Sequence, residues 1–449
     1  MTTSVQTPLS AAQKLLMQHA DHNQIVSALS RIKVTTDASW LSNSNPYSAD
    51  AQKQLKSDNF AVPSSQEDAF AEYLAAGAFV HCGDAWGYLG RAVDALVRGD
   101  LATAVHLTYY AELRGAISLL ASEGIYVGNG YNCVVTATGQ IEDVSKEGTH
   151  LAVWKLLDAW NTSARSSQVM GKVLRPGGVE LDSWVNALPG GALRPIVDDL
   201  LSSIAFDLQS FSADRTRRNT ASYNPTRLVA EDLSTSDMCR VVSHFWTTLE
   251  PDVRGGFPVL DHALLRRILT SNFSSINEVH DAAGQPTGQI DWSGWEPWLK
   301  MATPTQSVST ALYEQLKTDP TATQIDETLA AAFRNDAAST APGDFIESMF
   351  ARTTVLLRLS TGMCIRLLED SGIDMDAIEP WIDSLGLSRG LWSPSEVPES
   401  KLDLWVDTEI ALELLDTVTN SDAHGVIDQL RAHTVILGQT ERVVAWSFA

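Results

Sequence analysis

The chain has 449 residues, of which 44% are hydrophobic and 19% are charged, a composition that fits a globular protein and excludes a disordered or fibrous one. It contains no run of about 18 apolar residues, and its N-terminus lacks the basic and apolar segments of a secretory signal. The four cysteines form no Cys-x-x-Cys pair, which argues against a zinc site and a disulfide framework. These features predict a cytoplasmic protein that neither spans nor binds a membrane.

The formal net charge of −23 is concentrated in the second half of the chain. Residues 1–230 contain 18 Lys and Arg against 22 Asp and Glu, whereas residues 231–449 contain 14 against 33. The acidic half should repel nucleic acid and anionic membranes. We therefore expect two domains, 1–230 and 231–449, with any anionic ligand bound by the first.

Two stretches near the N-terminus, residues 9–33 and 64–98, have the 3.6-residue apolar spacing of helices. A polar, proline-containing loop is expected between them. Gly83, Gly87 and Gly90 lie inside the second stretch and permit either a break or a close backbone approach.

The clearest helix of the chain is predicted for residues 101–123. Asp100 precedes it and is a suitable N-terminal cap, and Gly124 follows it and is suited to end it. The helix is apolar except for a small polar set formed by His106, Tyr109, Glu112 and Arg114.

Residues 124–144 contain two β-rich runs separated by Gly-Asn-Gly, which predicts a hairpin. A helix is expected at 150–160 and a loop at 161–193, with a short helix near 180–187. The second long helix of this half is predicted for residues 195–218, and Pro225 should stop it.

The second half of the chain also has mainly helical patterns. We expect helices within 231–280, a connector at 281–310, and further helices at 308–317, 323–335, 344–371, 402–420 and 424–437. The sequence therefore predicts an all-α protein built of multi-helix bundles with one small β-hairpin.

The chain lacks most sequence signatures of catalysis. It has no phosphate-binding loop, no dinucleotide fingerprint, no His-Glu-x-x-His and no Gly-x-Ser-x-Gly. His106 and His150 have no histidine partner at metal-ligand spacing. We therefore expect neither a metal nor a cofactor.

One resemblance points to a function. The stretch HLTYYAELRGAISLL, followed by a helix with Arg218-Asn219-x-x-x-Tyr223, resembles the HEPN superfamily of small helical domains over residues 65–228. That resemblance implies a helical bundle that dimerises. Many members are metal-independent ribonucleases of toxin–antitoxin, CRISPR-linked and anti-phage systems, in which Arg and His act on the RNA phosphate and 2′-hydroxyl.

The chain departs from the family pattern at one position, because Tyr223 stands where the family has histidine. A phenol titrates near pH 10 and an imidazole near pH 6.5, so Tyr223 is a poor general base at neutral pH. His106 supplies the missing imidazole if its helix lies beside Arg218. The predicted catalytic set is Arg218, Asn219, Tyr223, His106 and Glu112, and the predicted substrate-binding set is Arg215, Arg217 and Arg114.

Two functions fit this sequence. One is a component of a bacterial defence or toxin system whose degenerate HEPN-like half gives homo-oligomers, while the acidic half binds a protein partner. The other is a metal-independent endoribonuclease that cleaves RNA through Arg218 with Tyr223 or His106. A third, weaker hypothesis is that the acidic surface mimics a polyanion in the nucleic-acid channel of a partner.

Overall fold

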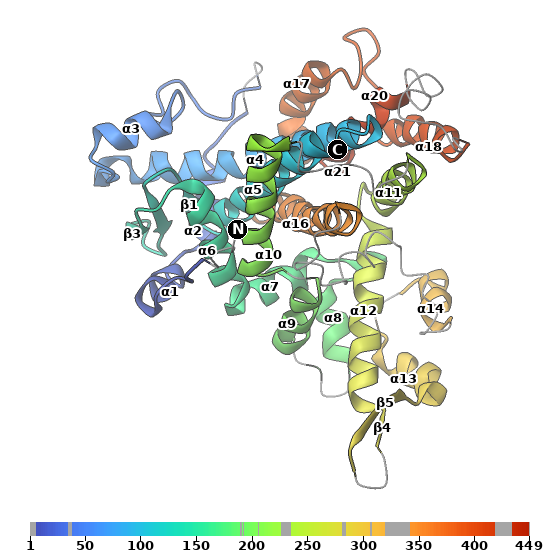
Figure 1. The fold of residues 1–449 in the computed structure, drawn as a ribbon. Coiled ribbons are helices and arrows are strands. Elements are labelled where there is room, and N and C mark those ends of the chain that lie inside the picture. The colour runs from blue at the N-terminus through green and yellow to red at the C-terminus, as the bar shows by residue number, and fades with distance from the viewer. Residues whose placement is uncertain are drawn as a thin grey trace.

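The computed structural model describes residues 6–34, 38–188, 191, 193–204, 206–225, 235–280, 284–305, 308–318, 342–417 and 433–448. Helices dominate these residues, and the strands form one three-stranded and one two-stranded antiparallel sheet (Figure 1). The prediction of an all-α protein with a small β element is therefore confirmed. No described helix is both long enough and apolar enough to cross a bilayer.

The predicted first helix is in fact two short helices, α1 (Ala11–Met17) and α2 (His22–Leu29). The chain breaks before Asp21, whose side chain caps α2 by accepting a hydrogen bond from the Gln24 backbone N–H at 3.0 Å. An Asp at this position competes with the helix and favours a new N-terminus. The loop that follows contains the short α3 (Ala51–Ser57).

The most extensive helix–helix packing in the first half is between α4 (Glu67–Val97) and α5 (Leu101–Ser122). Helix α4 runs unbroken through Gly83, Gly87 and Gly90, which instead allow close approach of other segments. A Cβ at Gly90 would lie 2.3 Å from the Gly438 carbonyl oxygen. Helix α5 begins as predicted, because the Asp100 side chain accepts a hydrogen bond from the Thr103 backbone N–H at 3.0 Å.

The predicted hairpin is part of a three-stranded sheet in the order β1 (Ile125–Val127), β2 (Asn132–Val135) and β3 (Ile141–Ser145). The Gly-Asn-Gly sequence makes the β1–β2 turn. A short loop then leads to α6 (Thr149–Asn161), which packs beside α5.

The segment predicted as a loop after α6 is more helical than expected, since it contains α7 (Ala164–Val173) as well as the expected short helix, α8 (Leu181–Ala187). The prediction of one continuous helix over residues 195–218 is also wrong. The segment divides into α9 (Leu193–Ser203) and α10 (Leu208–Tyr223). Asp207 caps α10 by accepting a hydrogen bond from the Ser210 backbone N–H at 2.8 Å.

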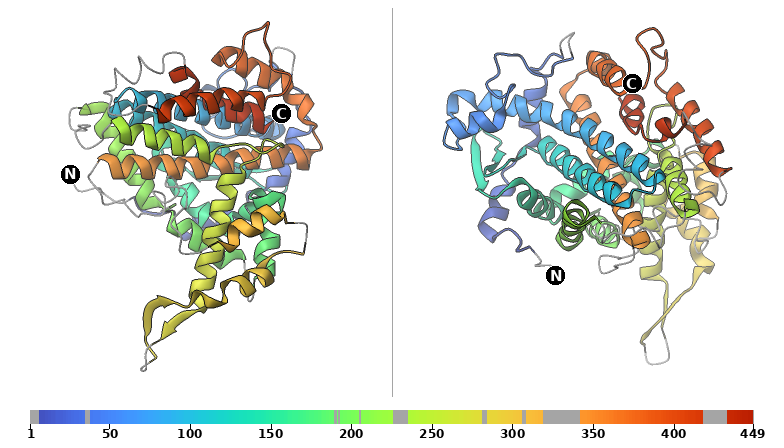
Figure 2. Two further views of the ribbon diagram at one scale, coloured as in Figure 1. Left: turned by 90° about the vertical axis from the view of Figure 1, so that its right-hand side faces the viewer. Right: turned by 45° about the horizontal axis from the view of Figure 1, so that its top comes forward.

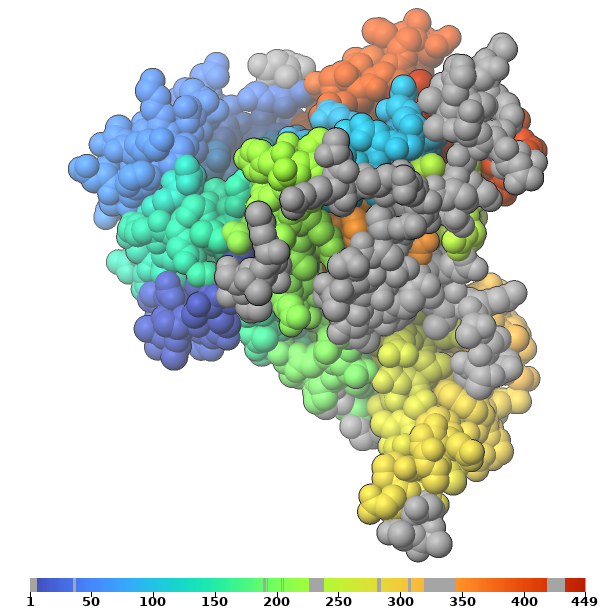
Figure 3. Space-filling view, in the orientation of Figure 1, coloured from blue at the N-terminus to red at the C-terminus, as the bar shows by residue number. Residues whose placement is uncertain are grey.

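The elements of residues 235–318 are α11 (Thr235–Thr248), α12 (Pro258–Ile276), β4 (Glu278–His280), β5 (Pro286–Ile290), α13 (Trp295–Ala302) and α14 (Thr310–Lys317). The end of α12 with β4, β5 and α13 forms the part of the described molecule that projects furthest from the bundle (Figures 2 and 3), whereas α11 packs against α4 and α18 (Asp403–Asp416). The predicted connector is wrong in part, because it contains a strand and a helix. Phe273 of α12 anchors this region, and the rings of Trp292, Trp295 and Trp298 each lie 5.3 Å from it.

The last part of the chain returns to the bundle. Its long helix α16 (Pro342–Ser371) packs against α5, α4, α2 and α7. It is followed by α17 (Glu379–Arg389), α18 (Asp403–Asp416), α20 (His433–Leu437) and α21 (Glu441–Ser447). The helix predicted at 323–335 and most of the one predicted at 424–437 lie outside the described residues.

Helices from the two sides of residue 230 share one core. The Ser360 hydroxyl of α16 donates to the Gly115 carbonyl of α5 at 2.8 Å. The Trp86 indole N–H of α4 donates to the Thr361 hydroxyl at 3.0 Å. Residue 230 marks the change in charge, and its role as a domain boundary stays a prediction.

Candidate functional site

Helices α5 and α10 lie side by side, and their polar residues meet at Arg218. The Arg218 guanidinium donates from Nη2 to the Tyr110 hydroxyl at 2.7 Å and lies over the rings of Tyr109 and Tyr110, 5.2 and 5.1 Å from their centroids. His106, one turn before Tyr110, places its Nδ1 2.7 Å from the Ser222 hydroxyl. The predicted juxtaposition of these two helices is therefore present.

A third helix contributes the imidazole nearest to Arg218. His150, at the start of α6, has its Nε2 3.5 Å from Arg218 Nη2 and its Nδ1 3.0 Å from the Tyr109 hydroxyl. A guanidinium only donates hydrogen bonds, so we assign Nε2 as the acceptor and place the proton on Nδ1. His150 is therefore neutral in this arrangement.

Burial and charge both favour the neutral form of these two histidines. Partial burial lowers the pKa of His150, and the nearby charges of Arg218 and Arg215 lower it further. Burial and then Arg218 lower the pKa of His106 in the same way. Both rings are thus able to accept a proton at neutral pH.

Arg215 and Arg218 are three residues apart on α10 and so share one face of that helix. Asn219 accepts a hydrogen bond from Arg218 Nη1 at 2.9 Å through its side-chain oxygen, and it is exposed. We call Arg218, His150, His106, Tyr109 and Tyr110 the Arg218 cluster.

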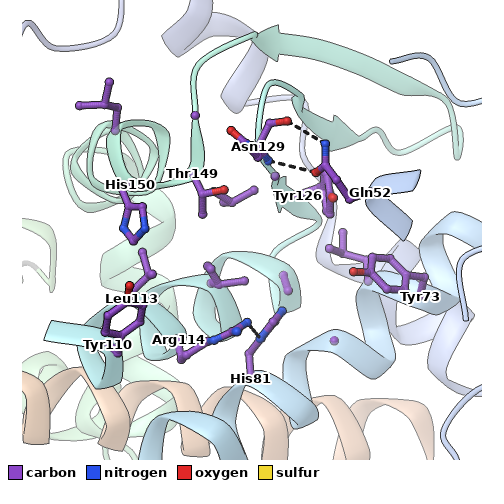
Figure 4. Close-up of a pocket in the computed structure, with 18 residues that line it drawn as sticks. Gln52, Tyr73, His81, Tyr110, Leu113, Arg114, Tyr126, Asn129, Thr149 and His150 are labelled. Atoms are coloured by element: carbon purple, nitrogen blue, oxygen red, sulfur yellow. Dashed lines mark hydrogen bonds between the residues drawn. The ribbon is translucent and has the colours of Figure 1, made fainter. Parts of the chain in front are cut away.

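The Arg218 cluster borders a pocket of about 640 Å³ between α4, α5, α6 and the β1–β2 turn. Tyr110 and His150 belong to both, and they stand at one end of the pocket in Figure 4. The described residues that line it include no Asp and no Glu. That absence is notable in a chain with a net charge of −23.

Arg114 lies in the wall of this pocket, one helical turn beyond Tyr110. Its Nη1 is 2.9 Å from Nδ1 of His81 on α4, and its Nε is 3.9 Å from the Asp84 carboxylate. Burial, and then the Arg114 charge, lowers the pKa of His81 to about 3. His81 is therefore neutral and accepts the hydrogen bond from Arg114.

Three of the predicted site residues lie away from the Arg218 cluster. Glu112 is wholly buried beneath it, and Arg217 pairs with the buried Asp214 at 2.7 Å. Tyr223, in the last turn of α10, is 76% exposed. Burial chiefly, and then repulsion from Asp214, raises the pKa of Glu112, while the Arg352 charge opposes that rise.

Three members of the cluster, His150, Tyr109 and Tyr110, are absent from the predicted site. His150 is 30 residues beyond the end of the HEPN-like helix motif, and only the packing of α6 on α5 brings it to Arg218. Tyr110 did carry a signal, because it lies four residues from both His106 and Arg114 and so shares their helix face.

We compared the chain with models of known protein families, with curated protein sequences and with solved structures, and it matches none of them. The resemblance to HEPN domains therefore stays a prediction that rests on the two sequence motifs.

Proposed function

We propose that the Arg218 cluster binds RNA phosphate and cleaves RNA without a metal ion, as part of a bacterial defence or toxin system. The observation that carries this proposal is the placement of His150 and His106 beside Arg218 on three neighbouring helices. Their imidazoles replace the one that Tyr223 removes from the motif. The assignment to a defence or toxin system rests on the resemblance to HEPN domains.

The proposed reaction is an internal transesterification of the RNA chain. His150 Nε2 accepts the proton of the 2′-hydroxyl, whose oxygen attacks phosphorus. The P–O5′ bond breaks, and the protonated form of His106 gives its proton to the departing 5′-oxygen. Arg218 stabilises the charge that develops on the non-bridging phosphate oxygens.

The geometry of Arg218 allows a phosphate to replace His150 as its hydrogen-bond acceptor. Its 3.5 Å separation from His150 is long for a hydrogen bond, so a phosphate oxygen can replace the imidazole as the acceptor at little cost. Binding of phosphate would thereby free Nε2 to act as the base.

A second candidate function is a non-catalytic scaffold that dimerises through the HEPN-like half and binds a protein partner through the acidic half. The exposed position of Tyr223 and the enclosed position of Glu112 favour it, since no hydrogen bond or ion pair joins either side chain to Arg218 among the described residues. The same experiment separates the two candidates.

The test is incubation of purified protein with mixed single-stranded RNAs in EDTA, comparing wild type with Arg218→Ala and His150→Asn. Arg98→Ala is the matched control, because Arg98 is a half-exposed arginine that, among the described residues, pairs with Asp94 alone, in the preceding turn of α4. The proposal predicts cleavage by wild type and Arg98→Ala and a loss of at least 100-fold in the other two. Equal cleavage by all four proteins, or none by any, would refute the nuclease, and the second result with an unchanged fold supports the scaffold.

A further inference from the structure

The pocket beside the Arg218 cluster extends well beyond the groups needed for phosphate cleavage. Its volume of about 640 Å³ lies within the range of roughly 300–1,000 Å³ of pockets that enclose small organic ligands. Most of its lining comes from α4, α5, β1 and the β1–β2 turn.

The far wall of the pocket is apolar and aromatic. The rings of Tyr73 and Tyr126 lie there, with centroids 6.2 Å apart and planes inclined by 60°. Ile117 of α5 also lines the pocket, and Leu113 adds aliphatic surface at the other end, beside Tyr110 (Figure 4). Such a wall suits a flat ring, which gains from both burial and ring–ring contact.

Arg114 provides a positive charge that can hold an anionic group of a ligand in the pocket. This residue keeps about a third of its side chain exposed, and it lies between Tyr110 and the aromatic wall in Figure 4. Its Nε is 3.9 Å from the Asp84 carboxylate and its Nη1 is bonded to His81, whereas its Nη2 has no hydrogen-bond partner among the described residues. Arg114 therefore retains donor capacity for an anion.

A second source of positive potential faces the same pocket. Thr149 and His150 line it, and they are the first two residues of α6. The N-cap residue of α6, Gly148, offers no side-chain cap. The N-terminal end of a helix favours negative charge, so α6 and Arg114 act in the same direction.

We propose that this pocket binds a small organic anion with an aromatic body, whose anionic group lies against Arg114 and whose ring lies against Tyr73 and Tyr126. Carboxylate and phosphate heads satisfy the same groups. This site goes beyond the proposed RNA chemistry and holds whether or not Arg218 cleaves RNA. Tyr110 and His150 line the same pocket, so a ligand bound there lies next to the Arg218 cluster.

Gly77 provides a way to close the pocket without disturbing the rest of the fold. It lies in α4, lines the pocket, and a Cβ added there meets only the His81 ring, at 3.9 Å. Leu at this position projects into the cavity, whereas Ala adds a single methyl group. Both residues favour a helix more than Gly does, so neither variant should unfold the protein.

The test is isothermal titration of the full chain with two families of probes. One contains 5′-AMP and 5′-UMP, with adenosine as the uncharged comparison. The other contains indole-3-acetate, with indole-3-acetamide as its uncharged comparison. We expect at least one anion to bind wild type and Gly77→Ala with similar Kd. Wild type should bind that anion at least 10-fold more tightly than its uncharged comparison. Gly77→Leu and Arg114→Gln should each bind the anion at least 10-fold more weakly than wild type does.

The set of probes that binds, nucleotides or indole acids, identifies the head group as phosphate or carboxylate. The inference is overturned if no anion binds wild type, or if Gly77→Leu binds as tightly as wild type. Its failure is distinct from failure of the proposed function, which is read from RNA cleavage by wild type and by the Arg218→Ala, His150→Asn and Arg98→Ala variants.

Discussion

Asp214 should be among the residues of α10 on which stability depends most. Its side chain is fully buried and pairs with Arg352 of α16, of which 1% is exposed, and with Arg217 in the next turn of α10. We predict that Asp214→Ala strongly destabilises the protein, because it leaves the Arg352 guanidinium buried without its counter-charge.

The expected loss is about 3–5 kcal/mol in the free energy of unfolding, the cost of removing one partner from a buried ion pair. That is a large fraction of the roughly 5–15 kcal/mol by which folded proteins are stable. The matched comparison is Asp94→Ala, which breaks an exposed pair with Arg98 at a separation of 2.9 Å and should cost about 0.3–0.5 kcal/mol.

The assay is urea denaturation of wild type, both single variants and the double variant Asp214→Leu/Arg352→Met. Replacing both charges with apolar side chains should recover most of the loss, since no unpaired Arg352 charge remains. The reasoning is refuted if Asp214→Ala costs less than about 1 kcal/mol, or if the double variant is as unstable as Asp214→Ala.

Three further predictions follow from contacts described above. Gly90→Ala should lower the melting temperature and cost about 1–3 kcal/mol in the free energy of unfolding, because its Cβ would meet the Gly438 carbonyl oxygen at 2.3 Å. Gly77→Ala should raise the melting temperature. Equal effects of the two variants would contradict this. Wild-type stability should fall as pH rises above 4.5, the ordinary pKa of Glu112, by up to about 1.4 kcal/mol per pH unit, because the folded state holds that proton longer; an unchanged slope of stability against pH in Glu112→Gln would count against it. If His150 and His106 act as base and acid, kcat/KM for RNA should be greatest below pH 6.5, since both pKa values are lowered; a maximum above pH 7 would exclude these roles.

Local sequence signals were sufficient for the elements whose ends are marked by one residue. Asp100 and Gly124 set the ends of α5 through a cap and a left-handed turn, with φ of +83° at Gly124. Such signals depend only on neighbours in the chain, so no knowledge of the fold is needed to read them.

The elements that were missed depend on contacts made far along the chain. Gly83, Gly87 and Gly90 of α4 read locally as a possible break, but helix α4 continues because α17, α21 and the loop before α21 pack against them. In the candidate site, His150 has no local motif and is identified only when α6 is seen to pack against α5. Long-range packing, unlike a cap, leaves little trace in the sequence around one residue.

The position of α16 has a consequence for how the chain is made. Helix α10 ends at Tyr223 and α16 ends at Ser371, so ~150 more residues must be translated, which takes roughly 7–30 s at ordinary ribosome speeds. During that interval the sides of α4 and α5 that later contact α16 are exposed to water. The nascent first half should therefore recruit chaperones, and residues 1–230 expressed alone should aggregate.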